Sequence, residues 1–344
     1  MSKNIVDKIK NTVAELGLDL TGKVVLTEAA TGAYVVTPII AACAGAKVYA
    51  YTKTTKYGSV KEVSEQTYAL ANQLGVADSI AIITELNPEM IGQADILTNS
   101  GHLRPISIDV LKSAKQGAVI PYMYEKWEFR EVDIDLNYCN LKKIKVVATN
   151  ERHPKIDVFN YLGELLIKQI HDAGKCIYNN KFIVISNNDF GPYLANTLSK
   201  LAYKVGVYDE LIRKNSYTNQ VEWLGEFSDI VFDQEYKDAE AVIFTAYPFV
   251  DKWFSEAKKL TIDFLLQLNN PFLIRYAGDI DTKLFDQNNI NYYPDTVKPG
   301  HMGILLSDIG FDPIIRLQAG GLKVADLACK DEYLFENEII GMLL

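Results

Sequence analysis

The same local pattern occurs twice in this chain, and it constrains the fold more than any other feature. An apolar strand that begins at a lysine leads into a polar turn, then into a glycine that opens a helix, with an aromatic residue two positions later. The first copy runs from Lys23 to Val36 and the second from Lys181 to Ala195. A repeated strand–turn–helix unit predicts two similar α/β domains in tandem, and a length of 344 residues accommodates two domains.

Apolar strands alternate with helices along both halves of the chain. The expected strands are residues 23–27, 46–52, 79–84, 95–98, 118–122 and 144–148, then 181–186, 204–208, 241–245 and 272–276. The clearest expected helices are residues 4–17, 32–43, 60–74 and 107–115. Such alternation requires crossover connections, which place helices on both faces of a mainly parallel sheet. We therefore expect the α/β class, with two Rossmann-like domains and a cleft between them.

The domain boundaries follow from helix start and stop signals. We expect a first domain, a connecting helix, a second domain and a C-terminal helical segment that packs back, at residues 1–152, 153–178, 179–300 and 301–344 respectively. The connecting helix is predicted because His153-Pro154 suits a helix start and Gly174 a helix end. The C-terminal segment is expected to break near Gly320-Gly321.

The turn of the first copy retains part of a dinucleotide-binding pattern. Where the fingerprint has G-x-G-x-x-G, this turn has Thr27, Ala29 and Gly32, so only the third glycine is present. The next strand ends without an acid for a ribose hydroxyl. It ends instead in Thr52 and Lys53, which suit a phosphate, so NADP is favoured over NAD. The alternatives are a packing role for the glycine and an ordinary polar loop.

The turn of the second copy departs from the fingerprint in a different way. It also keeps the third glycine, Gly191, but Asn188 fills the second position and Asp189 would repel a pyrophosphate. Asp209 closes the following strand, where a ribose-binding acid would lie. On balance the first half is favoured for the dinucleotide and the second half for the substrate.

The most informative stretch is A-D-I-L-T-N-S-G-H-L-R-P-I, residues 94–106, followed by a helix with lysines and a G-A-V strand. It resembles the dehydrogenase group that contains S-adenosylhomocysteine hydrolase, alanine dehydrogenase and the D-2-hydroxyacid dehydrogenases. In that group an A-D-I strand ends in a T-x-x-G loop beside the nicotinamide. The resemblance implies an NAD(P) cofactor, with Thr98, Ser100 and Gly101 near its nicotinamide ring.

Histidines and arginines follow two of the predicted strands. His102 and Arg104 lie in the loop after residues 95–98, at a carboxyl end where parallel sheets bind ligands. A histidine can exchange a proton with a substrate while hydride moves, and an arginine can hold a carboxylate. Arg152 and His153 have the same placement after the strand expected at residues 144–148. A loop-capping hydrogen bond, a surface salt bridge or a helix cap would explain these residues equally well.

Three further residues are candidates for substrate binding, namely Glu151, Tyr247 and His301. Glu151 could instead cap a helix, and Tyr247 could form an aromatic wall. The loop histidines lack the spacing of helical metal ligands, and the four cysteines form no C-x-x-C pair, so no metal site is expected.

Charge and composition restrict the possible partners. A formal charge of −9 gives no reason to expect nucleic acid or a membrane surface. Charged residues at the N-terminus argue against a signal peptide, so a cytoplasmic protein with a small-molecule substrate is expected, and a homo-oligomer is compatible with the sequence. The leading function is an NAD(P)-dependent oxidoreductase that acts on a small carboxylate-bearing substrate in the cleft. The alternatives are a non-redox lyase or nucleotide-dependent transferase, and a non-catalytic Rossmann-fold binding protein.

Overall fold

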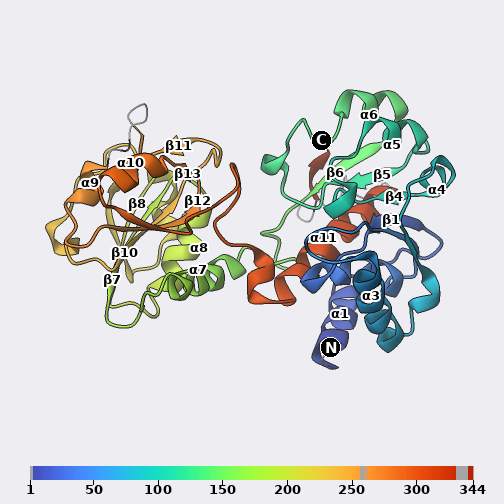
Figure 1. The fold of residues 1–344 in the computed structure, drawn as a ribbon, viewed down its shortest axis with the longest axis horizontal. Helices are drawn as coiled ribbons and strands as arrows, with labels where there is room; N and C mark the ends of the chain where they lie inside the picture. Colours follow the sequence, from blue (N-terminus) through green and yellow to red (C-terminus); the bar gives the residue numbers. More distant parts are fainter. Residues whose placement is uncertain (1–2, 256–259, 261, 331–339, 344) are drawn as a thin grey trace. The chain divides into compact units, whose positions relative to one another are not determined.

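The computed structural model describes residues 3–255, 260, 262–330 and 340–343 (Figure 1). It divides into two compact units. The first unit comprises Met1–Val158 together with Gly310–Leu344, and the second comprises Phe159–Ile309. The second unit is thus one continuous segment inserted between the two parts of the first.

The first unit is built on a seven-stranded sheet with the strand order β15-β6-β5-β4-β1-β2-β3. The strands are β1 (Val24–Glu28), β2 (Lys47–Tyr51), β3 (Ile80–Ile83), β4 (Ile96–Leu97), β5 (Val119–Pro121), β6 (Lys145–Thr149) and β15 (Ile340–Leu343). All neighbours pair in parallel except β15, which pairs antiparallel with β6. The central strands are buried along almost their whole length, as expected for a parallel sheet covered by helices.

Helices surround this sheet at the positions that the sequence indicates. They are α1 (Lys3–Glu15), α2 (Val36–Cys43), α3 (Val60–Leu74), α4 (Pro88–Gln93), α5 (Ile108–Ser113), α6 (Leu136–Lys142) and α11 (Asp312–Cys329), with short 3-10 helices at Gly32–Val35, Ala77–Ser79, Gly101–Leu103 and Lys126–Glu128. The ends of α3 show why the prediction succeeds. Ser59 and Glu62 form a capping box at its start, and Gly75 ends it in the left-handed conformation.

The predicted break at Gly320-Gly321 is wrong, because α11 continues through both glycines. The two glycines lie where the helix packs closely on its neighbours. A Cβ on Gly320 would lie 3.0 Å from Ile156, and a Cβ on Gly321 would lie 2.5 Å from the Sδ atom of Met123. Tertiary packing, rather than the weak helix propensity of glycine, explains these residues.

Gly321→Ala is therefore expected to destabilise the protein even though alanine favours a helix. Overpacking costs about 1–3 kcal/mol and improved helix propensity returns up to ~1 kcal/mol, so we expect a net loss of about 1–2 kcal/mol. Urea denaturation monitored by circular dichroism measures it. Gly92→Ala in α4 is the control, because its Cβ would lie 3.4 Å from the nearest carbonyl oxygen and should be tolerated. A stabilised Gly321→Ala variant would contradict this account.

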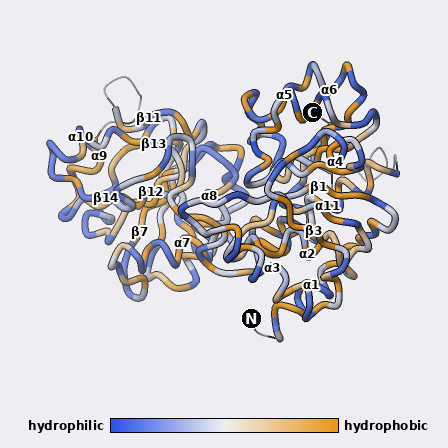
Figure 2. The backbone as a smooth tube through the Cα atoms, turned by 45° about the vertical axis from the view of Figure 1, so that its right-hand side comes forward, coloured by the Kyte–Doolittle hydropathy of each residue, from blue (hydrophilic) through white to orange (hydrophobic). Residues whose placement is uncertain are grey.

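The second unit is built on a six-stranded parallel sheet with the order β14-β12-β10-β7-β8-β9. Its strands are β7 (Lys181–Ser186), β8 (Lys204–Asp209), β9 (Val221–Glu226), β10 (Ala241–Thr245), β12 (Phe272–Ala277) and β14 (Asn291–Tyr293), with a separate pair β11 (Lys252–Trp253) and β13 (Asp279–Ile280). Its helices are α7 (Tyr161–Asp172), α8 (Phe190–Leu198), α9 (Asp263–Leu266) and α10 (Thr282–Gln287), with 3-10 helices at Leu211–Ser216, Gln234–Tyr236 and Leu306–Ile309. In Figure 2 the hydrophobic colours concentrate along the strands, and the connecting loops are mostly hydrophilic.

The predicted helix start at His153-Pro154 is also wrong. The helix of this region, α7, begins at Tyr161, and residues 151–157 form turns instead. The backbone N–H groups of Ile156 and Asp157 both donate to the carbonyl of His153. Asp157 then takes a positive φ of 55°, which ends the turn before a helix can propagate.

Both sheets share one order of parallel strands, which corresponds to 3-2-1-4-5-6 in each unit. This confirms the predicted α/β class with two Rossmann-like domains. The order reverses between β1 and β4 in the first unit and between β7 and β10 in the second. Ligands of open α/β sheets bind at such a topological switch point, outside the carboxyl ends of the strands. Each unit therefore has one position at which a site is expected.

Candidate functional site

Three hydroxyl side chains join the loops that follow β1 and β4, at the switch point of the first unit. The Oγ1 atoms of Thr27 and Thr98 lie 2.8 Å apart, and Oγ1 of Thr98 lies 2.8 Å from Oγ of Ser100. All three residues are buried. The structure thus brings together three of the residues that the sequence placed beside a cofactor.

Glu28, which the sequence analysis missed, lies at the same switch point. It is the last residue of β1 and only 4% of it is exposed. Its carboxyl group lies against Gly101, which has a φ of +43°, and a Cβ on that glycine would collide with Oε2 of Glu28. Burial raises the pKa of Glu28 to about 7, although a hydrogen bond with Ser100 lowers that pKa in part. An acid closing the apolar run V-V-L-T-E was the available signal.

The first turn does not fit the pyrophosphate of a dinucleotide. The N–H of Ala29 donates to the carbonyl of Tyr51 at 2.8 Å, and the N–H of Gly32 donates to Oε1 of Gln66 at 3.3 Å. The turn leads into a 3-10 helix, so α2 starts only at Val36. Donors that a phosphate would need are therefore engaged, and the carboxyl of Glu28 lies beside them. Thr52 is buried whereas Lys53 is exposed, so these two residues lie in different environments.

His102 lies half-buried beside the end of β2. Its ring packs edge-on against Tyr51, with 6.4 Å between the ring centroids. Burial lowers the pKa of His102, and the positive charge of Lys53 lowers it further. The imidazole is thus neutral near pH 7, and a neutral imidazole can accept a proton.

Arg104 belongs to an internal ion-pair network rather than standing open to a ligand. Its Nη2 and Nε atoms donate to Oδ2 of Asp133 at 2.8 and 3.0 Å, and its guanidinium lies 4.7 Å from the ring centroid of Tyr124. Arg130 and the hydroxyl of Tyr122 also donate to Asp133. These bonds hold the pKa of Asp133 below its usual range despite the burial that opposes them.

Three glutamates gather beyond the ends of β5 and β6. The backbone N–H of Glu151 donates to Oε1 of Glu125 at 2.9 Å, and the N–H of Glu125 donates to Oε1 of Glu128 at 3.2 Å. Burial, with the nearby carboxylates, raises the pKa of Glu128 to about 7 and that of Glu151 well above its usual value. Glu151, a predicted substrate-binding residue, is thus a buried acid within a group of acids.

Arg152 and His153 lie in the turn that follows β6. Arg152 is exposed, and its backbone N–H donates to Oδ1 of Asn150 at 3.1 Å. His153 is half-buried, and its Nδ1 accepts the N–H of Lys155 at 3.2 Å. Asn150 and His153 therefore stabilise this turn, in agreement with the capping alternative.

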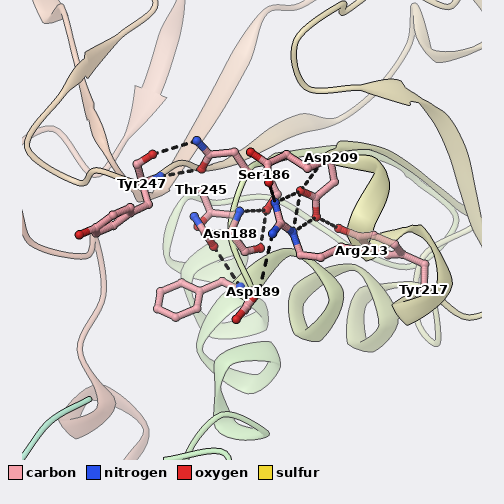
Figure 3. Close-up of polar contacts among 11 residues, drawn as sticks. Ser186, Asn188, Asp189, Asp209, Arg213, Tyr217, Thr245 and Tyr247 are labelled. Atoms are coloured by element: carbon pink, nitrogen blue, oxygen red, sulfur yellow. Dashed lines mark hydrogen bonds and ion pairs between the residues drawn. The ribbon is translucent and has the colours of Figure 1, made fainter. Parts of the chain in front are cut away.

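Asparagine side chains connect the two loops at the switch point of the second unit (Figure 3). The side-chain amide of Asn187 bonds to both backbone groups of Tyr247, at 2.8 and 2.7 Å. The side chain of Asn188 bonds to Thr245 and also accepts the N–H of Phe190 at the start of α8. The loops after β7 and β10 are thereby held together.

Asp209 ends β8 in a buried cluster of the second unit (Figure 3). Nη2 of Arg213 lies 2.9 Å from its Oδ1, and the hydroxyl of Tyr217 donates to its Oδ2. Burial raises the pKa of Asp209, while the bonds from Arg213 and Tyr217 lower it. Arg213 lies 3.7 Å from Asp189 as well. A Cβ on Gly191 would lie 2.5 Å from Oγ of Ser186, so this glycine allows α8 to pack close to its strand.

The second turn fits a nucleotide better than the first one does. The helix α8 begins directly after the turn, Gly191 keeps the packing role of the third glycine, and Asp209 occupies the strand end at which an acid would contact a ribose. Asn188 and Asp189 are the departures from the usual pattern. Of the other predicted residues, Tyr247 and His301 are exposed in this unit.

Two negative observations complete the description of the site. Among the described residues, no group of three histidine, cysteine or acidic side chains is arranged to hold a metal ion. No helix within the described part of the chain is long and apolar enough to cross a membrane.

Comparison with known proteins identifies the fold. No family model matches the chain, and no curated protein matches it in sequence. The structure is similar to that of a dipicolinate synthase chain from Bacillus subtilis (TM-score 0.57, 15% identity, 94% of this chain and 99% of that one). It is also similar to dipicolinate synthase from Bacillus halodurans (0.52, 14%, 91% and 99%) and to NAD-dependent formate dehydrogenase from Staphylococcus aureus in complex with NAD (0.51, 11%, 92% and 98%). These similarities confirm the resemblance to the NAD(P)-binding Rossmann group at the level of the fold.

Proposed function

We propose that this protein is an NAD(P)-dependent oxidoreductase that acts on a small carboxylate-bearing substrate. We assign the dinucleotide to the switch point of the second unit and the acid–base chemistry to that of the first. One observation carries this assignment. Glu28 and engaged N–H groups occupy the first turn, whereas α8 starts directly at the second turn, beside Asp209. The shared fold with an NAD-dependent enzyme supports the oxidoreductase class.

The residues of the second unit would hold the nucleotide as follows. The start of α8 would face the pyrophosphate, and Asp209 with Arg213 would lie at the ribose. When bound, the nicotinamide supplies the hydride acceptor or donor of the reaction.

The residues of the first unit act on the substrate in this proposal. His102, neutral because its pKa is lowered, accepts the proton of a substrate hydroxyl. Arg104 is bound to Asp133, so the exposed Arg152 is the predicted arginine that attracts an anionic substrate.

Titration of the purified protein with NADH and NADPH tests the function. We expect binding of at least one of them, seen as a change in nucleotide fluorescence and as a raised melting temperature. If neither nucleotide binds, the oxidoreductase proposal is wrong, and the lyase, transferase or non-catalytic alternatives take its place.

Asp189→Asn tests which unit holds the nucleotide. The Asp189 carboxylate lies directly before α8, where it would repel a pyrophosphate, so its neutralisation should tighten NADH binding by about two- to fivefold. Fluorescence titration at low ionic strength measures the change. Asp238→Asn is the matched control, because Asp238 pairs with Lys181 at the opposite edge of the same sheet. Equal effects of both variants, or none, would argue against a nucleotide at this turn.

A further inference from the structure

One buried carboxyl group at the switch point of the first unit has no role in the chemistry above. Glu28 ends β1, and its carboxyl lies in the space that Gly101 leaves by having no side chain. Ser100, from the same loop as Gly101, is its hydrogen-bond partner. Ser100 is in turn fixed by Thr98, and Thr98 by Thr27. The carboxyl is thus held at the edge where a ligand of this sheet should bind.

The surroundings of Glu28 favour its neutral form. Burial is the main influence on its pKa, and among the described residues no basic side chain acts on it. Tyr124, from the segment after β5, faces Glu28, Glu128 and Arg104 together. Arg104 is already paired with Asp133, and His102, next to Gly101, is neutral. At neutral pH much of Glu28 is therefore a carboxylic acid, which can donate a hydrogen bond.

Two polar atoms beside Glu28 lack hydrogen-bond partners among the described residues. They are Oγ1 of Thr52 and Oδ1 of Asn99, and both are buried. Thr52 follows Tyr51, which lies opposite Glu28 in the β1–β2 ladder, and Asn99 precedes Ser100. Buried polar groups are nearly always satisfied, so unsatisfied ones on both sides of this edge indicate room for a polar ligand.

We propose that Glu28, in its protonated form and together with the hydroxyl of Ser100, binds the carboxylate of the small substrate at this switch point. The inference rests on the proposed function and deepens it by naming the group that receives the substrate's anion. A neutral carboxyl forms a short, charge-assisted O–H···O⁻ bond with a carboxylate, whereas an ionised one would repel it. The neighbouring His102 then lies beside the oxygen that exchanges its proton.

Ligand binding and proton binding are linked at such a site. The pKa of Glu28 is about 7 without a ligand. Binding of an anion to the acid form raises that pKa further, so the protein takes up a proton when the ligand binds above neutral pH. Affinity for a small carboxylate should therefore fall about tenfold from about pH 6 to about pH 8.

Isothermal titration calorimetry with oxamate, a small analogue of a 2-oxo acid, tests the inference. Titrations near pH 8 in two buffers with different ionisation enthalpies give the number of protons taken up. We expect close to one proton per oxamate for the wild-type chain, and the tenfold loss of affinity with pH. Absence of oxamate binding, or binding without proton uptake, would overturn the inference without any variant.

Glu28→Gln and Glu128→Gln separate this site from other buried acids. Glutamine keeps the shape and the hydrogen-bond donor of the acid, so Glu28→Gln should bind oxamate with neither proton uptake nor pH dependence. Glu128 has a pKa that is also raised to about 7, but it lies beyond β5, so Glu128→Gln should leave the uptake unchanged. Proton uptake that persists in Glu28→Gln would assign it to another group.

The outcome is independent of the nucleotide. Proton-coupled oxamate binding in a chain that binds neither NADH nor NADPH would keep this site and reject the oxidoreductase. Nucleotide binding without oxamate binding would do the reverse.

Discussion

Replacement of Asp133 with alanine should lower the free energy of unfolding by about 3–5 kcal/mol, since it removes one partner from a buried ion pair. The Asp133 side chain is 3% exposed and accepts hydrogen bonds from Arg104, Arg130 and Tyr122. Without it, the guanidinium of Arg104 keeps its position over Tyr124 but has lost its counter-ion. The variant leaves a desolvated charge, which costs more than the lost bonds themselves.

Urea denaturation followed by tryptophan fluorescence and circular dichroism measures this loss. Asp109→Ala provides the control, because Asp109 forms an exposed ion pair with Lys112 and should change stability by less than about 0.5 kcal/mol. Asp133→Asn, which keeps one acceptor, should fall between the two. A loss near that of Asp109→Ala would mean that the network contributes nothing beyond a surface pair.

Glu28→Gln should stabilise the protein, and only above about pH 5. The folded-state pKa of Glu28 is about 7, above the ordinary value of 4.5, so the native state binds more protons than the unfolded state in this window. Stability therefore falls as pH rises from about 4.5 to 7 and is then level. The difference of about 2.5 units corresponds to about 3 kcal/mol, an order-of-magnitude value, and Gln avoids this cost.

The measurement compares the free energies of unfolding of wild type and Glu28→Gln at several pH values between about 5 and 8. The difference should be close to zero at the lower end and greatest at the upper end. Glu62→Gln is a suitable reference, because Glu62 is an exposed capping residue whose pKa is lowered, so its stabilising effect has the opposite dependence on pH. A difference that does not change with pH would show that Glu28 ionises freely.

The sequence was sufficient for the fold where local signals and tertiary packing agree. The strand at 241–245 and the helix at 60–74 were predicted to the residue, because apolar runs and caps determine them directly. It was insufficient where packing overrides local preference. The glycines of α11 resemble a helix break until Met123 and Ile156 are seen against them. Likewise Pro154 suits a helix start, but the positive φ of Asp157 closes the turn.

The candidate site shows the same limit. Position in the chain relative to strand ends was enough to find Thr98, Ser100 and His102, because parallel strands deliver their following loops to one edge. The partners of these residues could not be found in this way. Asp133 is far from Arg104 in the sequence, and the fit of Glu28 against Gly101 depends on the register of two strands that are distant in the chain.

The insertion of the second unit has a consequence for the order of events during synthesis. The segment from Phe159 to Ile309 is continuous, so it leaves the ribosome complete and can fold while the rest is still being made. The first unit cannot, because α11, which is buried along most of its length, belongs to it and is translated afterwards. The unit whose strands are made first is thus the last to be finished, and its nascent sheet waits with an uncovered face until residues 312–329 emerge.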